Sequence, residues 1–182
     1  VKLGDSIVIL GSGCIGLMTL LAAKARGASD ITVVDIMDNR LEKAMEMGAA
    51  RVINARKEDV LVAVDKITNG RGMDIAFETA GSEITAKQTA HLIRRGGTAV
   101  LVGMTSNNSF EYDFAALMAK EATIRMVFRY KNIYPAAISA IAHGNIDLSK
   151  LNPTEYSFSD IADAFEDNIN HKNDITKIVI KM

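Results

Sequence analysis

Residues 7–16 read IVILGSGCIG, an apolar run followed by three glycines at the spacing G-x-G-x-x-G. The β-branched run predicts a buried strand over 6–10. The apolar stretch after the glycines predicts a helix over 14–26, and Gly27 is well placed to end it. Three glycines between a strand and a helix predict a tight turn, in which backbone segments approach each other closely.

Outward from this turn, short β-branched runs alternate with stretches of helical periodicity, a pattern typical of a parallel α/β sheet. Strands are predicted over 6–10, 31–34, 51–54, 74–77, 98–102 and 123–127. Helices are predicted over 14–26, 39–47, 58–68, 82–93, 114–119 and 134–142. This succession fits a doubly wound parallel six-stranded sheet, the Rossmann fold, with the strand order 3-2-1-4-5-6.

Residues 1–150 are expected to form this α/β domain, and residues 151–182 differ from it in character. The later segment contains a charged amphipathic helix over 159–170 and a short apolar strand over 177–180. Val1 stands almost directly before the first predicted strand, so we expect the chain to be a piece of a longer protein.

Composition excludes several classes of function. A formal net charge of −1 offers no basic excess for nucleic acid or an acidic membrane surface. No apolar run reaches the length that spans a bilayer. Cys14 is the single cysteine, so an intrachain disulfide is impossible. Without a recognisable secretory signal, the expected location is the cytoplasm.

The glycine turn has the pattern of a dinucleotide-binding loop. Gly11 permits the tight turn, Gly13 lets the backbone approach a pyrophosphate, and Gly16 lets the helix pack on the sheet. The free amides and the positive end of the helix dipole attract the pyrophosphate. The alternative is a glycine-rich turn without a ligand, but the strand, loop and helix all agree with a dinucleotide site.

Asp35 follows the second predicted strand, 19 residues after Gly16. A carboxylate at this position accepts hydrogen bonds from the adenosine ribose and repels the 2′-phosphate of NADP, which favours NAD. The alternative is that Asp35 only caps the next helix. Arg40 has two interpretations, a guanidinium against the adenine or a solvated residue paired with Glu42 or Glu46.

Cys14 and the three histidines are weak candidates for catalytic or metal-binding roles. Cys14 at a helix N-terminus could be a reactive thiolate, but it better fits a small residue in contact with the dinucleotide. His91, His143 and His171 have no zinc-ligand spacing and are expected at the surface or at helix ends.

Four segments together resemble the zinc-dependent medium-chain alcohol dehydrogenases. Residues 11–48 resemble the segment of these enzymes that forms the first half of the cofactor site. Residues 77–81, FETAG, resemble the strand ending that faces the nicotinamide ribose, and 96–104, GGTAVLVGM, resemble the strand whose tip holds the nicotinamide side. Residues 127–130, VFRY, resemble a segment of the sorbitol and polyol dehydrogenase branch.

The resemblance implies a cofactor site at the strand ends and a substrate contact beside it. The implied NAD-binding residues are Gly11, Gly13, Cys14, Ile15, Gly16, Asp35, Ile36, Arg40, Thr79, Ala80, Gly81, Val102, Gly103, Met104, Val127, Phe128 and Arg129. Arg129 and Tyr130 are implied to reach towards a sugar alcohol. The alternative for Arg129 is an arginine at the surface without a ligand, and the alternative for Tyr130 is an aromatic residue that only packs within the fold. The apolar segment 123–128 is implied to pair two subunits of a dimer or tetramer, since an exposed edge strand needs cover.

In this family the catalytic zinc is bound by Cys, His and Glu residues of an N-terminal domain, which this chain lacks. The resemblance therefore implies no catalytic and no metal-ligating residue here. It implies an NAD-dependent enzyme that oxidises a secondary alcohol of a polyol, of which this piece binds the cofactor without catalysing. Residues 151–182 are implied to pack on the N-terminal domain.

Three other functions stay open. The first is a threonine or sugar-phosphate alcohol dehydrogenase of the same family. The second is a non-catalytic dinucleotide-sensing module that works by dimerising. The third, an adenosine-binding methyltransferase, is disfavoured because such enzymes carry an acid before the glycine loop, where this chain has Ile9-Leu10.

Overall fold

The computed structural model describes residues 1–107, 109–171 and 174–182. Its centre is a parallel sheet of six strands with the predicted order β3-β2-β1-β4-β5-β6. The strands are β1 (Ser6–Leu10), β2 (Asp30–Asp35), β3 (Arg51–Asn54), β4 (Met73–Glu78), β5 (Ile93–Leu101) and β6 (Thr123–Met126). The order reverses direction between β1 and β4, and a crevice at such a switch point is where doubly wound sheets bind ligands.

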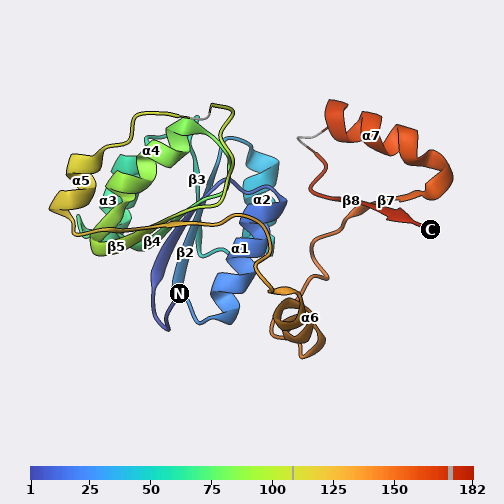
Figure 1. Ribbon diagram of the computed structural model, residues 1–182, viewed down its shortest axis with the longest axis horizontal. Helices are drawn as coiled ribbons and strands as arrows, with labels where there is room; N and C mark the ends of the chain where they lie inside the picture. Colours follow the sequence, from blue (N-terminus) through green and yellow to red (C-terminus); the bar gives the residue numbers. More distant parts are fainter. Residues whose placement is uncertain (108, 172–173) are drawn as a thin grey trace.

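Helices cover both faces of the sheet (Figure 1). The helices are α1 (Cys14–Ala25), α2 (Asp38–Glu46), α3 (Val60–Thr68), α4 (Glu83–Leu92), α5 (Phe114–Ala119), α6 (Tyr134–Ala142) and α7 (Ile161–Asn170). Side chains of α1 and α2 pack on one face, and side chains of α3, α4 and α5 pack on the other.

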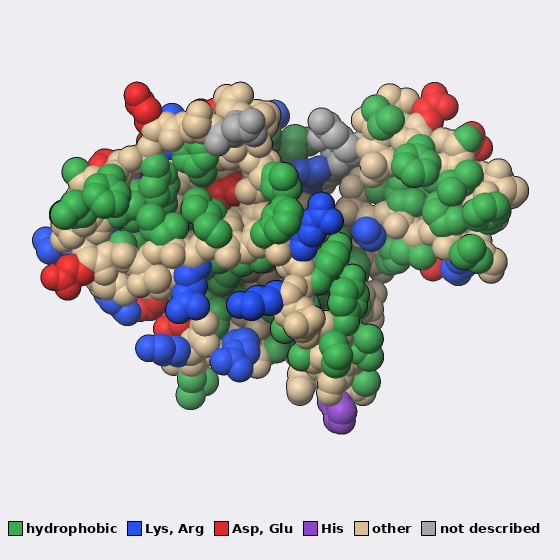
Figure 2. Space-filling view, viewed as in Figure 1, with side chains coloured by type: hydrophobic (Ala, Val, Ile, Leu, Met, Phe, Trp, Pro, Cys, Tyr) green, Lys and Arg blue, Asp and Glu red, His purple; other side chains and the backbone are tan. Residues whose placement is uncertain are grey.

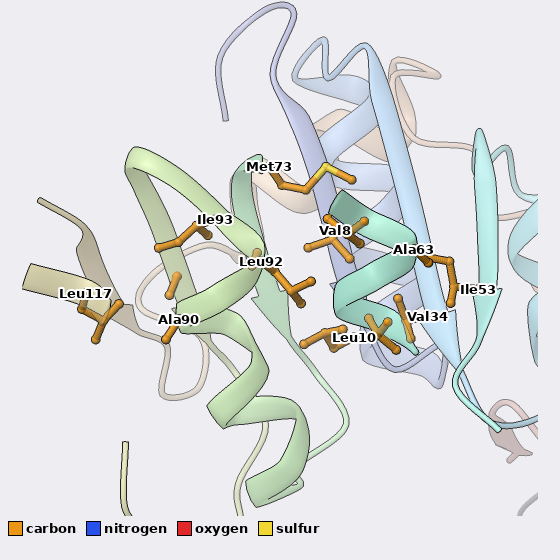
Figure 3. Packing of buried hydrophobic residues seen from close by; sticks show 14 residues of the cluster. Val8, Leu10, Val34, Ile53, Ala63, Met73, Ala90, Leu92, Ile93 and Leu117 are labelled. Carbon is orange, nitrogen blue, oxygen red and sulfur yellow. The ribbon is translucent and has the colours of Figure 1, made fainter. Parts of the chain in front are cut away.

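Strand β1 contributes to both cores because its side chains point alternately to the two faces. Val8 and Leu10 pack with α3 and α4, whereas Ile7 and Ile9 pack with α1 and α2, and all four are fully buried. Figure 3 shows the α3 side, where sheet and helix side chains interdigitate. This packing anchors the strand from which the glycine turn begins.

Helix ends follow local capping chemistry, which explains small shifts from the predicted bounds. The helix predicted from residue 58 begins at Val60, because the Asp59 carboxylate accepts hydrogen bonds from the amides of Leu61 and Val62 at 2.8 and 3.0 Å. Gly27 follows α1 with a φ of +87°, as expected for a glycine that ends a helix.

Two strands differ from the prediction by more than one residue at an end. Strand β5 begins at Ile93 rather than 98, because Ile93 already pairs with Met73 before the register shifts and Thr98 pairs with Ile75. The Gly96-Gly97 pair thus lies in an irregular part of the strand rather than before it. Strand β7 (Thr154–Ser157), which was not predicted, pairs in parallel with β8 (Ile178–Lys181).

A buried carboxylate ties together the amino ends of β1, β4 and β5. Asp74 accepts hydrogen bonds from the amide and hydroxyl of Ser6 at 2.9 and 2.7 Å, from Arg71 at 2.7 Å and from Arg94. Burial raises the pKa of Asp74, but the hydrogen bonds from Arg94, Ser6 and Arg71 outweigh burial and hold the pKa far below its ordinary 3.8.

We expect Asp74→Asn to destabilise the fold by about 1–3 kcal/mol at neutral pH, because charge-assisted hydrogen bonds of a buried group are lost. A lowered folded-state pKa stabilises the protein fully above the unfolded-state pKa, near 3.8, and this stabilisation is lost as the pH falls towards the folded-state value. Urea unfolding should therefore show the gap between variant and parent constant from pH 7 to about 5 and shrinking below about 4. A gap independent of pH down to the acid limit would contradict this role of the charge.

Apolar side chains are exposed on the C-terminal helices. Ile138 on α6 and Phe165 and Ile169 on α7 are all more than half exposed, and Figure 2 shows hydrophobic side chains gathered over both helices. None of the helices in the described parts of the chain is long and apolar enough to cross a bilayer.

Candidate functional site

The turn between β1 and α1 brings three backbone segments into close contact. Gly11 has a φ of +97°, and a Cβ there would lie 2.9 Å from the amide nitrogen of Ala80. A Cβ on Gly16 would lie 1.9 Å from the carbonyl oxygen of Gly11. A Cβ on Gly13 would meet nothing within 4 Å. Gly11 and Gly16 are therefore required by packing, whereas Gly13 borders open space.

The first turn of α1 presents its amides without internal partners. Among the described residues, no acceptor is found for the backbone N–H groups of residues 13–16. The first turn carries no acidic side chain, and Gly13 in the N-cap position makes no side-chain cap. Unpaired amides at the positive end of a helix dipole are suited to bind an anion such as a pyrophosphate.

Asp35, at the end of β2, holds the glycine turn to the sheet. Its Oδ2 accepts hydrogen bonds from the amide and the hydroxyl of Ser12 at 2.8 and 3.0 Å. Its Oδ1 accepts from the amides of Ile36 and Met37 at 2.7 and 3.1 Å. The carboxylate is thus placed beside the glycine turn, and the adjoining Ile36 side chain is about half exposed.

Glu78, at the end of β4, organises the neighbouring turn. It is 1% exposed, and its Oε1 accepts hydrogen bonds from the amides of Ala80 and Gly81 at 2.8 and 2.9 Å and from the Thr85 hydroxyl at 2.8 Å. A Cβ on Gly103 would lie 2.4 Å from Glu78 Oε2. The buried carboxylate therefore sets the position of both the 79–81 turn and the backbone after β5.

Backbone hydrogen bonds join the strand ends into one continuous edge. The amides of Val102 and Gly103 donate to the carbonyl oxygen of Glu78 at 2.9 and 3.0 Å. The Thr79 hydroxyl donates to the carbonyl oxygen of Gly11 at 3.0 Å. A Cβ on Gly81 would lie 2.7 Å from the carbonyl oxygen of Met104. The predicted residues of β1, β4 and β5 are thus brought together.

The segment after β6 is joined to this edge through Val127. The amide of Val127 donates to the carbonyl oxygen of Leu101 at 2.9 Å. Beyond it, Phe128, Arg129 and Tyr130 are exposed. The Arg129 guanidinium lies 5.1 Å from the centre of the Phe128 ring, and the Tyr130 ring lies 5.2 Å from that of Tyr134. Tyr130 therefore combines an aromatic contact with an exposed face.

Arg40 lies on α2 near the glycine turn. It lines a cavity of about 250 Å³ together with Ser12, Lys43 and Leu151. Glu46, one of the partners considered for Arg40, forms an ion pair with Lys43 at 2.9 Å. A basic residue thus stands beside the place where the adenosine half of a dinucleotide is expected.

A wider cavity, of about 850 Å³, lies at the opposite end of the sheet and is lined by Arg71, Arg94 and Lys120 among others. These three basic side chains already interact with other groups of the protein. Arg71 and Arg94 bind Asp74. The Lys120 ammonium donates to the carbonyl oxygens of Ala90, His91 and Ile93. Burial lowers the pKa of Lys120. This cavity is separate from the glycine turn.

The histidines lie at the surface and near helix ends, as predicted. His143 follows α6 and its Nδ1 lies 2.8 Å from the carbonyl oxygen of Ser139. His171 follows α7 and pairs with Asp167 at 3.1 Å, and His91 lies 3.4 Å from the Asp113 carboxylate. In the described part of the chain, no three His, Cys, Asp or Glu side chains form a group that could hold a metal ion. The described residues therefore do not fit a zinc centre.

Sequence reasoning missed two contributors to this edge, Ser12 and Glu78. Ser12 occupies a variable position of the glycine motif, and its link to Asp35 is visible only in three dimensions. Glu78 offered a signal, since an acid that directly ends an apolar strand must find partners when it is buried.

Comparisons with known proteins agree with the geometry. Residues 14–143 match the family model described as zinc-binding dehydrogenase. An uncharacterized zinc-type alcohol dehydrogenase-like protein of Escherichia coli is 46% identical over 182 residues, which are 100% of this chain and 52% of that protein. Sorbitol dehydrogenase of Bacillus subtilis is 39% identical over 97% of this chain and 50% of its own length.

A solved structure adds a cofactor. It is a short chain alcohol dehydrogenase of Escherichia coli CFT073 in complex with NADH. The match has a TM-score of 0.87 at 25% identity and covers 100% of this chain and 53% of that one. The chain thus spans about half the length of the relatives it matches. It belongs to the zinc-binding dehydrogenase family.

Proposed function

We propose that this chain binds NAD across the carboxyl ends of β1, β2, β4, β5 and β6. The observation that carries the proposal is the unpartnered row of amides at residues 13–16, beside the Asp35 carboxylate. An anion-binding helix end next to an acidic strand end suits a pyrophosphate joined to a ribose. The NADH complex of a relative supports this choice of ligand.

Within this proposal, the two halves of the cofactor are bound by different chemistry. Asp35, Ile36 and Arg40 contact the adenosine half, and Asp35 disfavours NADP through repulsion of its 2′-phosphate. Gly13, Cys14 and Ile15 contact the pyrophosphate. The backbone at residues 79–81, 102–104 and 127–129 positions the nicotinamide ribose and carboxamide.

The whole protein is proposed to oxidise a secondary alcohol of a polyol. NAD held at the carboxyl ends of the strands would supply its nicotinamide ring as the hydride acceptor. The relative named sorbitol dehydrogenase supports a polyol, and exposed Arg129 and Tyr130 carry groups that could contact sugar hydroxyls. The family's zinc is proposed to be bound outside this chain, since the described residues do not fit it.

Two surfaces are proposed as contacts of the whole protein. Residues 151–182, whose helix α7 exposes Phe165 and Ile169, are proposed to pack on an N-terminal domain. Segment 123–128 is proposed to pair with a second subunit as a dimer or tetramer. Met126 and Phe128 expose apolar area at this edge, and an uncovered edge strand invites pairing.

Calorimetric titration of the chain with NAD and NADP tests the proposal. We expect saturable NAD binding at one site, with NADP at least about tenfold weaker because the 2′-phosphate approaches a carboxylate. No saturable binding of either dinucleotide would refute the proposed function, and equal affinities would refute the role of Asp35. For the full-length protein, turnover of a panel of polyols and of threonine distinguishes the substrate classes.

A further inference from the structure

The Asp35 carboxylate has no acceptor site to spare. A carboxylate offers about four lone-pair positions on its two oxygens. The four donors already present are the Ser12 amide and hydroxyl on Oδ2 and the amides of Ile36 and Met37 on Oδ1. Asp35 is 8% exposed and Ser12 only 1% exposed, so these four protein donors are the main partners of the carboxylate. A ribose hydroxyl that donates to Asp35 must therefore displace one of them.

The Ser12 hydroxyl is the donor that can leave. The amides of Ile36 and Met37 belong to the backbone at the end of β2 and the start of α2, and the Ser12 amide belongs to the glycine turn. Moving any of these amides would shift the backbone, whereas the Ser12 hydroxyl leaves by rotation about a single bond. Ser12 also borders the cavity of about 250 Å³ that Arg40 lines. The exchange thus takes place next to space that a ligand can enter.

We propose that the Ser12 hydroxyl competes with the adenosine ribose of NAD for Oδ2 of Asp35, and so sets the affinity for the cofactor. This inference rests on the proposed NAD site. In the free protein the hydroxyl satisfies the carboxylate. On binding, one charge-assisted hydrogen bond replaces another, so the ribose gains only the difference between the two. A side chain without a donor at residue 12 would leave that lone pair to the ribose alone.

The chain contains a matched control at the other end of β1. The amide and hydroxyl of Ser6 both donate to Oδ2 of Asp74, at 2.9 and 2.7 Å, just as those of Ser12 donate to Oδ2 of Asp35. Ser6→Ala therefore removes the same kind of hydrogen bond far from the glycine turn. It should leave the affinity for NAD unchanged.

The test compares Ser12→Ala and Ser6→Ala by calorimetry with two probes, NAD and an NAD analogue whose adenosine ribose lacks both hydroxyls. We expect Ser12→Ala to bind NAD about 3- to 10-fold more tightly than the parent chain, the size of a typical net hydrogen bond, because the ribose bond replaces a bond that the free protein already makes. With the analogue the gain should vanish, because the competing hydroxyls are absent. Ser12→Cys, whose thiol is a weak donor, should change the NAD affinity in the same direction and serves if the alanine variant unfolds.

The outcomes distinguish a failure of the proposed competition by Ser12 from a failure of the proposed NAD site. If the parent chain binds NAD but Ser12→Ala binds it equally or more weakly, the competition is refuted and the NAD site stands. An equal gain with NAD and with the analogue also refutes the competition. If the parent chain does not bind NAD, the proposed function fails, and the inference fails with it.

Discussion

The Gly13→Ala variant should fold as stably as the parent chain and bind NAD at least about 100-fold more weakly. A Cβ on Gly13 meets no protein atom within 4 Å, and the φ of −68° suits alanine. The added methyl group would stand where the pyrophosphate must approach the free amides of α1. Thermal unfolding and calorimetry on the same sample measure the two effects separately.

Gly16→Ala provides the contrast. Its Cβ would lie 1.9 Å from the carbonyl oxygen of Gly11, so the helix must move away from the sheet. This variant should lose both stability and NAD binding. If Gly13→Ala bound NAD normally, the cofactor would not pass over the open side of the glycine turn.

Asp35→Ala should weaken NAD binding about 10- to 100-fold and relax the discrimination against NADP, since both attraction to the ribose and repulsion of the 2′-phosphate disappear. It should also destabilise the fold by about 1–3 kcal/mol, because the amides of Ser12, Ile36 and Met37 lose their acceptor. Calorimetry with both dinucleotides and urea unfolding measure these effects.

Asp38→Ala is the control for Asp35→Ala. Asp38 lies three residues further on, is exposed, and pairs with Lys57 at 2.8 Å. Exposed ion pairs contribute little, so this variant should change neither affinity nor preference. An unchanged preference for NAD in Asp35→Ala would remove the argument that this carboxylate excludes NADP.

The sheet could be predicted from sequence because each buried strand and each amphipathic helix has its own local pattern. Strand 51–54 and helices 114–119 and 134–142 agree with the structure residue by residue. The start of β5 could not be predicted, since Gly96-Gly97 indicates a turn and only pairing with β4 shows that the strand begins earlier. Strand β7 has a polar sequence, and it exists through its partner β8.

In the candidate site, too, some residues could be predicted from a local pattern and others depend on contacts that form only in the folded chain. The three glycines have a fixed spacing and Asp35 ends the apolar strand β2, so Gly11, Gly16 and Asp35 could be recognised from the local sequence. Glu78 could not be assigned its role, because its partners become visible only when the turn after β4 folds back on it. The link between Ser12 and Asp35 spans 23 residues and depends on the adjacency of β1 and β2.

The frame for the cofactor at the carboxyl edge of the sheet consists largely of main-chain groups, from the unpaired amides of residues 13–16 to the amides of Val102 and Gly103 that pair with Glu78. Main-chain groups are the same whichever side chains surround them, provided that the few glycines and buried acids stay in place. Substitutions can therefore accumulate over most of the domain without altering the frame for the cofactor. The side chains around the alcohol can then change between members of such a family while the cofactor frame stays the same. One frame can therefore serve enzymes with different substrates.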